Sequence, residues 1–187
     1  MMERAIGLIE LRSIAKGLET ADAMVKAARV SLFFSKPICP GKYLVLVGGG
    51  VASVESSVQA GANIAGPTAL SHCVIPSVHE SVFPALSRAS PVNEPGALGI
   101  IETFSAVSTI LAADAAAKAA AVELVEVRLA TGIGGKAFVT LTGDVAAVEA
   151  AVQAGSVPAK ERGDLVETVV IPAPARELFD LAVFGRI

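Results

Sequence analysis

The sequence contains no tryptophan, and only 4% of its residues are aromatic. Because 53% of its 187 residues are nevertheless hydrophobic, the core has to be built from alanine, valine, isoleucine and leucine. Side chains of that size favour thin, closely packed helices and strands. The same excess of apolar residues predicts that much apolar surface is buried between subunits.

An excess of basic residues and an apolar run long enough to span a membrane are also missing. The formal net charge is −3, so nothing points to nucleic acid, whose phosphates normally require a basic patch. The uncharged stretch between Glu102 and Asp114 has eleven residues, whereas a membrane-spanning helix needs about 20. The N-terminus carries Glu3 and Arg4 before a short apolar run and lacks the layout of a signal peptide. We therefore expect a cytoplasmic protein.

Cysteine is scarce as well. Two cysteines, Cys39 and Cys73, are too few for a disulfide framework. Cys73 lies in an apolar run and is expected to be a buried strand residue that behaves as a small hydrophobe. Cys39 lies between Pro37 and Pro40, whose rings fix φ on either side of it and restrict the turn.

What the chain does contain is a duplication, because residues 1–90 and 95–187 are two copies of one sequence. Nine of the thirteen residues from 49 to 61 are identical to those from 143 to 155. The offset between equivalent residues is 92 at the start of the copies, 94 in the middle and 96 at the end. This pattern predicts two fused domains of one fold rather than a short-period solenoid.

Each copy predicts the same series of elements. In the first copy these are a strand over 5–11, a helix over 18–29, strands over 30–35 and 42–47, a helix from 48–50 to about 66, a strand over 70–75 and a short helix over 76–86. Residues 97–183 repeat the series, and residues 87–96 are the expected linker. The order βαββαβ is a ferredoxin-like arrangement, so the predicted fold class is α+β with two such domains in tandem.

Four motifs make the sequence resemble a known family. They are Gly-Leu-Ile-Glu at 7–10, Asp-Ala-x-x-Lys-Ala-Ala at 22–28, Gly-Gly-Lys at 134–136 and Gly-Asp-Val-Ala-Ala-Val at 143–148. Together they resemble the shell proteins of bacterial microcompartments (BMC), in their tandem-domain class. Both copies begin at the first strand, so the resemblance is to the unpermuted type. It implies a homotrimer that forms a pseudohexameric disc.

In this family the turn between the second and third strands of each domain lines a central pore. The resemblance therefore implies that the pore is lined by Pro37, Ile38, Cys39, Pro40, Gly41 and Lys42 from the first copy and by Thr131, Gly132, Ile133, Gly134, Gly135 and Lys136 from the second. Three turns of each kind would alternate around the axis. Chemistry placed only in the first copy would then be presented three times.

The Cys-Pro-Gly-Lys turn at 39–42 also resembles that of the propanediol-utilisation T shell proteins, which implies a [4Fe-4S] cluster. One thiol cannot hold a cluster, but a three-fold axis would bring three Cys39 thiolates together and leave one iron for water or an outside ligand. Lys36 and Lys42 would offset the negative charge of the cluster. The cluster would allow electron or cluster transfer across the shell, to or from encapsulated redox enzymes. Without it, Cys39 is a small pore-lining residue, and the axis is a gate for small polar metabolites.

The resemblance also implies an assembly edge. Lys26 and Lys118 occupy equivalent positions on the first helix of each copy, and in the family a lysine there contacts its counterpart in a neighbouring disc. Shell proteins often carry an arginine directly after the Ile-Pro turn, whereas this chain has Ser77 and Ala173 there. We therefore expect edge-to-edge assembly that is weaker or includes other shell proteins.

The sequence disfavours several alternative functions. The glycine-rich segment 132–136 lacks the Walker spacing and does not open a helix, so a phosphate loop is disfavoured. His72 and His79 have no nearby carboxylates of the kind found in a triad or metal site, and are expected to be a strand residue and a helix-start residue. A trimeric nucleotide-binding regulator would need a basic phosphate cluster that is not visible. No acid, base and nucleophile converge as an enzyme would require.

Overall fold

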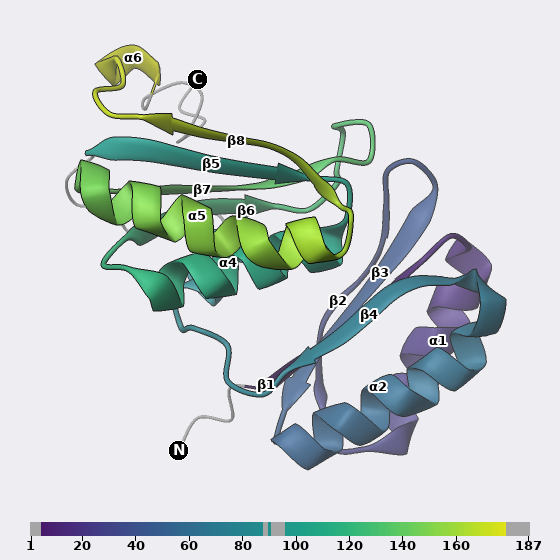
Figure 1. Cartoon of the computed structure of the whole chain (residues 1–187). Helices are drawn as coiled ribbons and strands as arrows, with labels where there is room; N and C mark the ends of the chain where they lie inside the picture. The colour runs from purple at the N-terminus through teal and green to yellow at the C-terminus, as the bar shows by residue number, and fades with distance from the viewer. Residues whose placement is uncertain (1–4, 88–89, 91–95, 179–187) are drawn as a thin grey trace. The chain divides into compact units, whose positions relative to one another are not determined.

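The computed structural model describes residues 5–87, 90 and 96–178 (Figure 1). The first copy forms β1 (Ala5–Leu11), α1 (Ile14–Ala27), β2 (Ser31–Ile38), β3 (Lys42–Gly49), α2 (Val51–Ala65), the 3₁₀ turn η1 (Gly66–Thr68), β4 (Ala69–Ile75) and α3 (Val82–Leu86). The second copy forms β5 (Ala97–Thr103), α4 (Ala106–Ala119), β6 (Glu123–Arg128), β7 (Ala137–Gly143), α5 (Val145–Glu161), β8 (Leu165–Ile171) and α6 (Arg176–Leu178).

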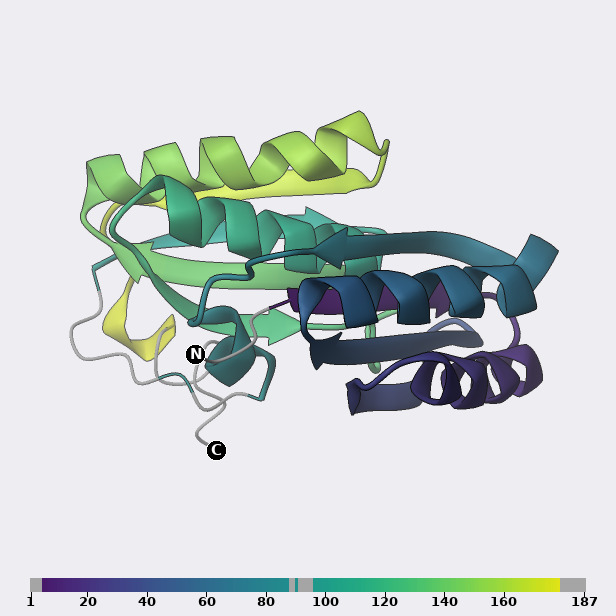
Figure 2. The ribbon, with the colours of Figure 1, turned by 90° about the horizontal axis from the view of Figure 1, so that it is seen from below.

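Each copy builds one four-stranded sheet. The strand orders are β2-β3-β1-β4 and β6-β7-β5-β8, and every neighbouring pair is antiparallel. In the first copy α1 and α2 pack against each other and on one face of the sheet, and in the second copy α5 packs on β5 and β8 (Figures 1 and 2). The predicted ferredoxin-like βαββαβ fold is therefore confirmed in both copies.

The chain divides into two compact units. Unit 1 contains residues 1–78, 105–107 and 130–135, and unit 2 contains residues 79–104, 108–129 and 136–187. Unit 1 thus includes the start of α4 and the loop after β6, whereas α3 belongs to unit 2. The domain boundaries predicted from the duplication stay a prediction, and most of the expected linker lies outside the described residues.

The core of unit 1 is built from small and medium side chains at short range. A Cβ at Gly7 of β1 would lie 2.3 Å from Cγ2 of Val58 and 2.8 Å from Cγ1 of Val54, so α2 rests directly on the strand at this glycine. A Cβ at Gly61 of α2 would in turn lie 2.5 Å from Cγ of Met24 in α1. Glycine at these two points allows the close packing that a core without large aromatic side chains requires.

We expect Gly7→Ala to lower the free energy of unfolding by about 1–3 kcal/mol, because the added methyl group overpacks the contact between β1 and α2. Chemical denaturation measures this loss. Adding Val58→Ala makes room for the new methyl group, so the double variant should regain part of the lost stability. A single variant as stable as the wild type would show that α2 can move away from the strand at little cost.

The first helix begins earlier than the sequence predicts. The apolar spacing indicates a helix over 18–29, whereas α1 begins at Ile14. The reason is an N-cap, because the Ser13 hydroxyl accepts a hydrogen bond from the Lys16 amide at 3.2 Å. The cap adds a first helical turn that apolar periodicity does not reveal.

The short helix after β4 begins later than predicted. A helix over 76–86 is expected from the sequence, but α3 begins at Val82. The preceding segment makes a turn in which the His79 amide donates to Oδ1 of Asp114 at 2.7 Å. The amide is therefore used to bind α4 rather than to extend the helix.

Candidate functional site

The turn that carries Cys39 is shorter than the sequence predicts. β2 continues through Ile38 instead of ending near residue 35, because its last residues pair with the beginning of β3, Ile38 lying opposite Lys42. Only three residues then join the strands. Gly41 has φ of 77° and open space where a Cβ would be, so a glycine is needed there for its backbone freedom.

The Cys39 turn rests on the loop of the second copy that belongs to the same unit. The Cys39 amide donates a hydrogen bond to the Ala130 carbonyl at 2.7 Å. The bond between Cys39 and Pro40 is cis. A Cβ at Gly135 would lie 2.6 Å from Cδ of Pro40, so this glycine lets the two backbones meet. The Cys39 thiol is free of any disulfide and partly exposed.

The supporting loop, residues 130–135, has an unusual backbone. Ala130 has φ of 39°, the one positive value outside glycine among the described residues, and its side chain is fully buried. Gly132, Gly134 and Gly135 have φ of 75°, 65° and 86°. A left-handed alanine is strained. Its carbonyl is the one that binds Cys39, so the strain accompanies the support of the turn.

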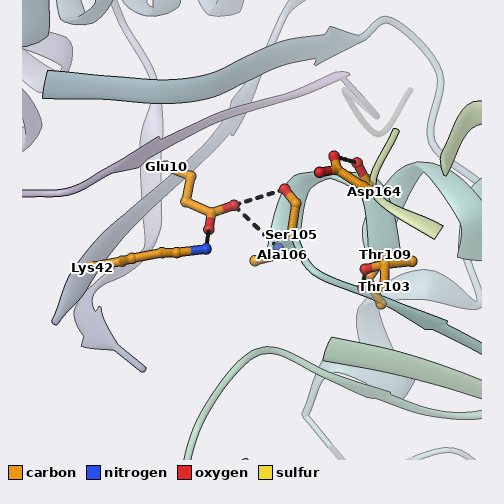
Figure 3. A network of polar contacts seen from close by, with 8 residues as sticks. Glu10, Lys42, Thr103, Ser105, Ala106, Thr109 and Asp164 are labelled. Atoms are coloured by element: carbon orange, nitrogen blue, oxygen red, sulfur yellow. Dashed lines mark hydrogen bonds and ion pairs between the residues drawn. The ribbon is translucent and has the colours of Figure 1, made fainter. Parts of the chain in front are cut away.

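A buried carboxylate holds the other end of the Cys39 turn (Figure 3). Glu10, only 1% exposed, pairs through Oε1 with Nζ of Lys42 at 2.8 Å. Its Oε2 accepts from the Ser105 hydroxyl at 2.8 Å and from the Ala106 amide at 3.1 Å. One carboxylate thereby ties the first residue of β3 to the N-terminus of α4, where the helix dipole also favours negative charge.

The remaining predicted pore residues of the first copy have other surroundings. Pro37 is an exposed residue of β2 rather than part of a turn, and Ile38 is 4% exposed. Nζ of Lys36 lies 4.7 Å from the centre of the Phe34 ring, within the range of a cation–π contact. The ammonium of Lys42 is engaged by Glu10. Lining of a pore by these residues, and by the loop that contains Thr131 and Ile133, stays a prediction.

The other residues singled out by the sequence do not form a second site. Cys73 lies in β4 opposite Leu8 and is half-buried rather than buried as predicted. His72 is an exposed residue of the same strand, and the His79 ring bonds the Ser81 hydroxyl at 2.7 Å. Among the described residues, no three histidine, cysteine, aspartate or glutamate side chains gather as a metal site within the chain.

The two equivalent lysines each pair with an aspartate one turn earlier. Lys26 binds Asp22 at 2.6 Å in α1, and Lys118 binds Asp114 at 2.6 Å in α4. The side chains of Lys26 and Asp22 are 74% and 61% exposed, whereas that of Asp114 is only 11% exposed. A role of either lysine at a disc edge stays a prediction.

Two tandem ferredoxin-like domains, whose second and third strands are joined by a three-residue turn in the first copy and by a longer loop in the second, define the class of protein. The model of the BMC domain matches residues 5–78 and 97–174, so the chain belongs to the BMC-domain family of bacterial microcompartment shell proteins. The family resemblance seen in the sequence is thereby confirmed. Within the part of the chain that the structure describes, no helix is long and apolar enough to cross a bilayer.

Individual relatives match the chain over nearly its whole length. The bacterial microcompartment shell protein PduT of Citrobacter freundii is 46% identical over 184 residues, which is 98% of this chain and 100% of the relative. A crystal structure of a microcompartments protein from Desulfitobacterium hafniense DCB is 57% identical, has a TM-score of 0.85, and covers 93% of this chain and 97% of its own. The single-copy shell protein EutM of Escherichia coli K12 is 44% identical over 89 residues, which is 48% of this chain and 90% of the relative.

Proposed function

We propose that this shell subunit assembles as a homotrimer and holds a [4Fe-4S] cluster between the Cys39 turns of its three chains. The observation that carries the proposal is the Cys39 turn itself. The thiol is free and partly exposed, and the backbone beside it is anchored at both ends, through the Ala130 carbonyl and through the pair of Lys42 with Glu10.

The donor set fits such a cluster. Soft thiolates are the usual ligands of iron–sulfur clusters, and three of them leave one iron for water or an outside ligand. A single chain offers one thiol at this place, so the site requires a symmetric assembly of chains. Cys73 lies on a different element, in β4. When bound, the cluster would supply one-electron transfer.

The chain's own part in this function is to position the thiol. The anchored turn limits the movement of Cys39, so that three copies could meet at one axis without reordering the backbone first. Electrons would pass between an oxidoreductase enclosed in the compartment and a carrier outside the shell. The subunit would then be a structural component of the shell, together with other shell proteins, and would also carry electrons across it.

Anaerobic purification with iron and sulfide analysis tests the proposal. We expect a brown protein with about four irons and four sulfides for three chains. Cys39→Ser should abolish the colour and the iron, whereas Cys73→Ser, the matched control, should keep both. Both variants should remain folded and keep the oligomeric state of the wild type, which sedimentation measures.

A colourless protein that takes up no iron under anaerobic reconstitution would overturn the cluster. If that protein is still trimeric, the axis is better interpreted as a pore for small polar metabolites. Tight binding of a common nucleotide, measured by calorimetry, would instead favour a trimeric regulator.

A further inference from the structure

A polar contact that is complete in unit 1 has an incomplete counterpart in unit 2. In unit 1 the Glu10 carboxylate binds the Ser105 hydroxyl and the Ala106 amide at the start of α4. Its counterpart in the second copy, Glu102, pairs with Lys136 at 3.0 Å, as Glu10 pairs with Lys42. The Glu102 side chain is 30% exposed, compared with 1% for Glu10. Glu102 therefore lacks the burial that a helix N-terminus would provide.

The start of α1 carries the counterparts of the residues that bind Glu10 in unit 1. Ser13, Ile14 and Leu18 lie 92 positions before their counterparts. These counterparts are Ser105, Ala106 and Ile110. Ile14 and Leu18 are 45% and 57% exposed, whereas Ala106 and Ile110 are fully buried. The same face of the equivalent helix is thus covered in one copy and open in the other.

The sheet face around Glu102 is hollow. A cavity of about 330 Å³ opens there, and two carboxylates, Glu102 and Glu167, line it. The rest of the lining is mostly apolar and includes Leu98, Ile100, Phe138, Thr140 and Val169. On the first sheet the counterparts Ile6, Leu8, Leu44 and Leu46 are at most 1% exposed. On the second sheet Ile100 and Phe138, the counterparts of Leu8 and Leu44, are partly exposed, whereas Leu98 and Thr140 are buried. An apolar helix face is therefore open on α1, and a mostly apolar hollow with two carboxylates, Glu102 and Glu167, is open on the second sheet.

A second contact repeats the pattern independently. In unit 2 the His79 amide binds Oδ1 of Asp114 at 2.7 Å. The counterparts are Ala175 and Asp22, and both are exposed. Also in unit 2, α3 packs against β6, whose Leu124 and Val125 are buried. Their counterparts on β2, Leu32 and Phe33, are 45% and 48% exposed.

We propose that a second copy of the chain closes these contacts. Glu102 of one chain accepts hydrogen bonds from the Ser13 hydroxyl and the Ile14 amide of the next, and Ile14 and Leu18 enter the hollow. Ala175 of the first chain then faces Asp22 of the second. The Ser13 oxygen already accepts from the Lys16 amide, and its hydroxyl proton remains to be donated.

Because the second sheet of one chain binds α1 of the next, the interface is head-to-tail. Three chains joined in this way would close into a ring. It rests on the proposed homotrimer and names the residues that would hold it together. Because the contact inside unit 1 and the contact between chains use equivalent residues, six similar joints would alternate around the ring.

The test uses variants of Ser13 that keep the helix cap. Aspartate caps a helix as well as serine does, but it places a second carboxylate against Glu102. We expect Ser13→Asp to raise the concentration at which the trimer dissociates by about a hundred-fold. Ser13→Thr keeps both the cap and the donor, and should assemble like the wild type. Sedimentation velocity over a dilution series measures each variant.

Two further variants separate the joint from a general loss of folding. Glu102→Gln combined with Ser13→Asp removes the repulsion and should restore most of the assembly. Ser105→Asp makes the equivalent change inside unit 1, and should lower thermal stability at every protein concentration. Glu149→Ala removes an exposed carboxylate on α5 and should change neither property.

The failures of the two proposals are distinguishable. A Ser13→Asp protein that assembles at wild-type concentrations overturns the joint and leaves the proposed trimer standing. A wild-type protein that is monomeric at every concentration overturns both. A Ser13→Asp protein that dissociates without rescue by Glu102→Gln shows that Ser13 faces a different partner, which also overturns the joint.

Discussion

Replacing Glu10 by alanine is expected to lower the free energy of unfolding by about 3–5 kcal/mol, because the substitution breaks a buried, hydrogen-bonded charge pair. The Lys42 ammonium, whose side chain is only 22% exposed, would lose its pair with the Glu10 carboxylate. The Ser105 hydroxyl and the Ala106 amide would lose an acceptor in a buried place. Urea denaturation at one fixed protein concentration measures the loss, since assembly contributes to the apparent stability.

Two comparisons isolate the Glu10 contact. Glu19→Ala removes an exposed carboxylate that also pairs with a lysine, Lys16 at 2.8 Å, and should cost no more than about 0.5 kcal/mol. Lys42→Met combined with Glu10→Ala removes both members of the pair, so the double variant should be more stable than the sum of the single losses indicates. A loss of less than about 1 kcal/mol for Glu10→Ala would mean that water replaces the carboxylate easily.

The fold was predictable because the apolar spacing that indicates each helix and strand occurs twice, once in each copy. Of the three errors in element bounds, two came from features that periodicity does not carry. The start of α1 depends on the Ser13 cap, and the end of β2 depends on its position at the edge of the sheet. At an edge, Pro37 is tolerated inside a strand because its missing amide proton faces no partner strand.

The candidate site was only partly predictable. The Cys39 turn was identified through the family resemblance, from residues that are neighbours in the sequence. Its supports are not local, since Glu10 and Ser105 are 95 positions apart. The available signal was a glutamate at the last position but one of an otherwise apolar strand in both copies, at Glu10 and Glu102. A buried position for a charged side chain demands partners, but the sequence does not say which partners the fold supplies.

Replacing Gly135 by alanine is expected to displace the Cys39 turn and to remove most of the iron of the proposed cluster. Two effects combine at this position. Gly135 has φ of 86°, which costs an L-residue about 1–2 kcal/mol, and its new Cβ would lie 2.6 Å from Cδ of Pro40. Because the added carbon meets the proline ring next to Cys39, the backbone of the turn has to move.

The chain offers matched controls in the same loop. Gly132 and Gly134 also have positive φ, of 75° and 65°, but no atom lies within 4 Å of an added Cβ at either position. Gly132→Ala and Gly134→Ala should therefore lose similar stability through backbone strain while keeping their iron. The rate at which a maleimide modifies Cys39, measured in a Cys73→Ser background without the cluster, reports on the turn itself. We expect this rate to change in Gly135→Ala and not in the two controls, and equal rates in all three variants would show that the loop does not hold the turn in place.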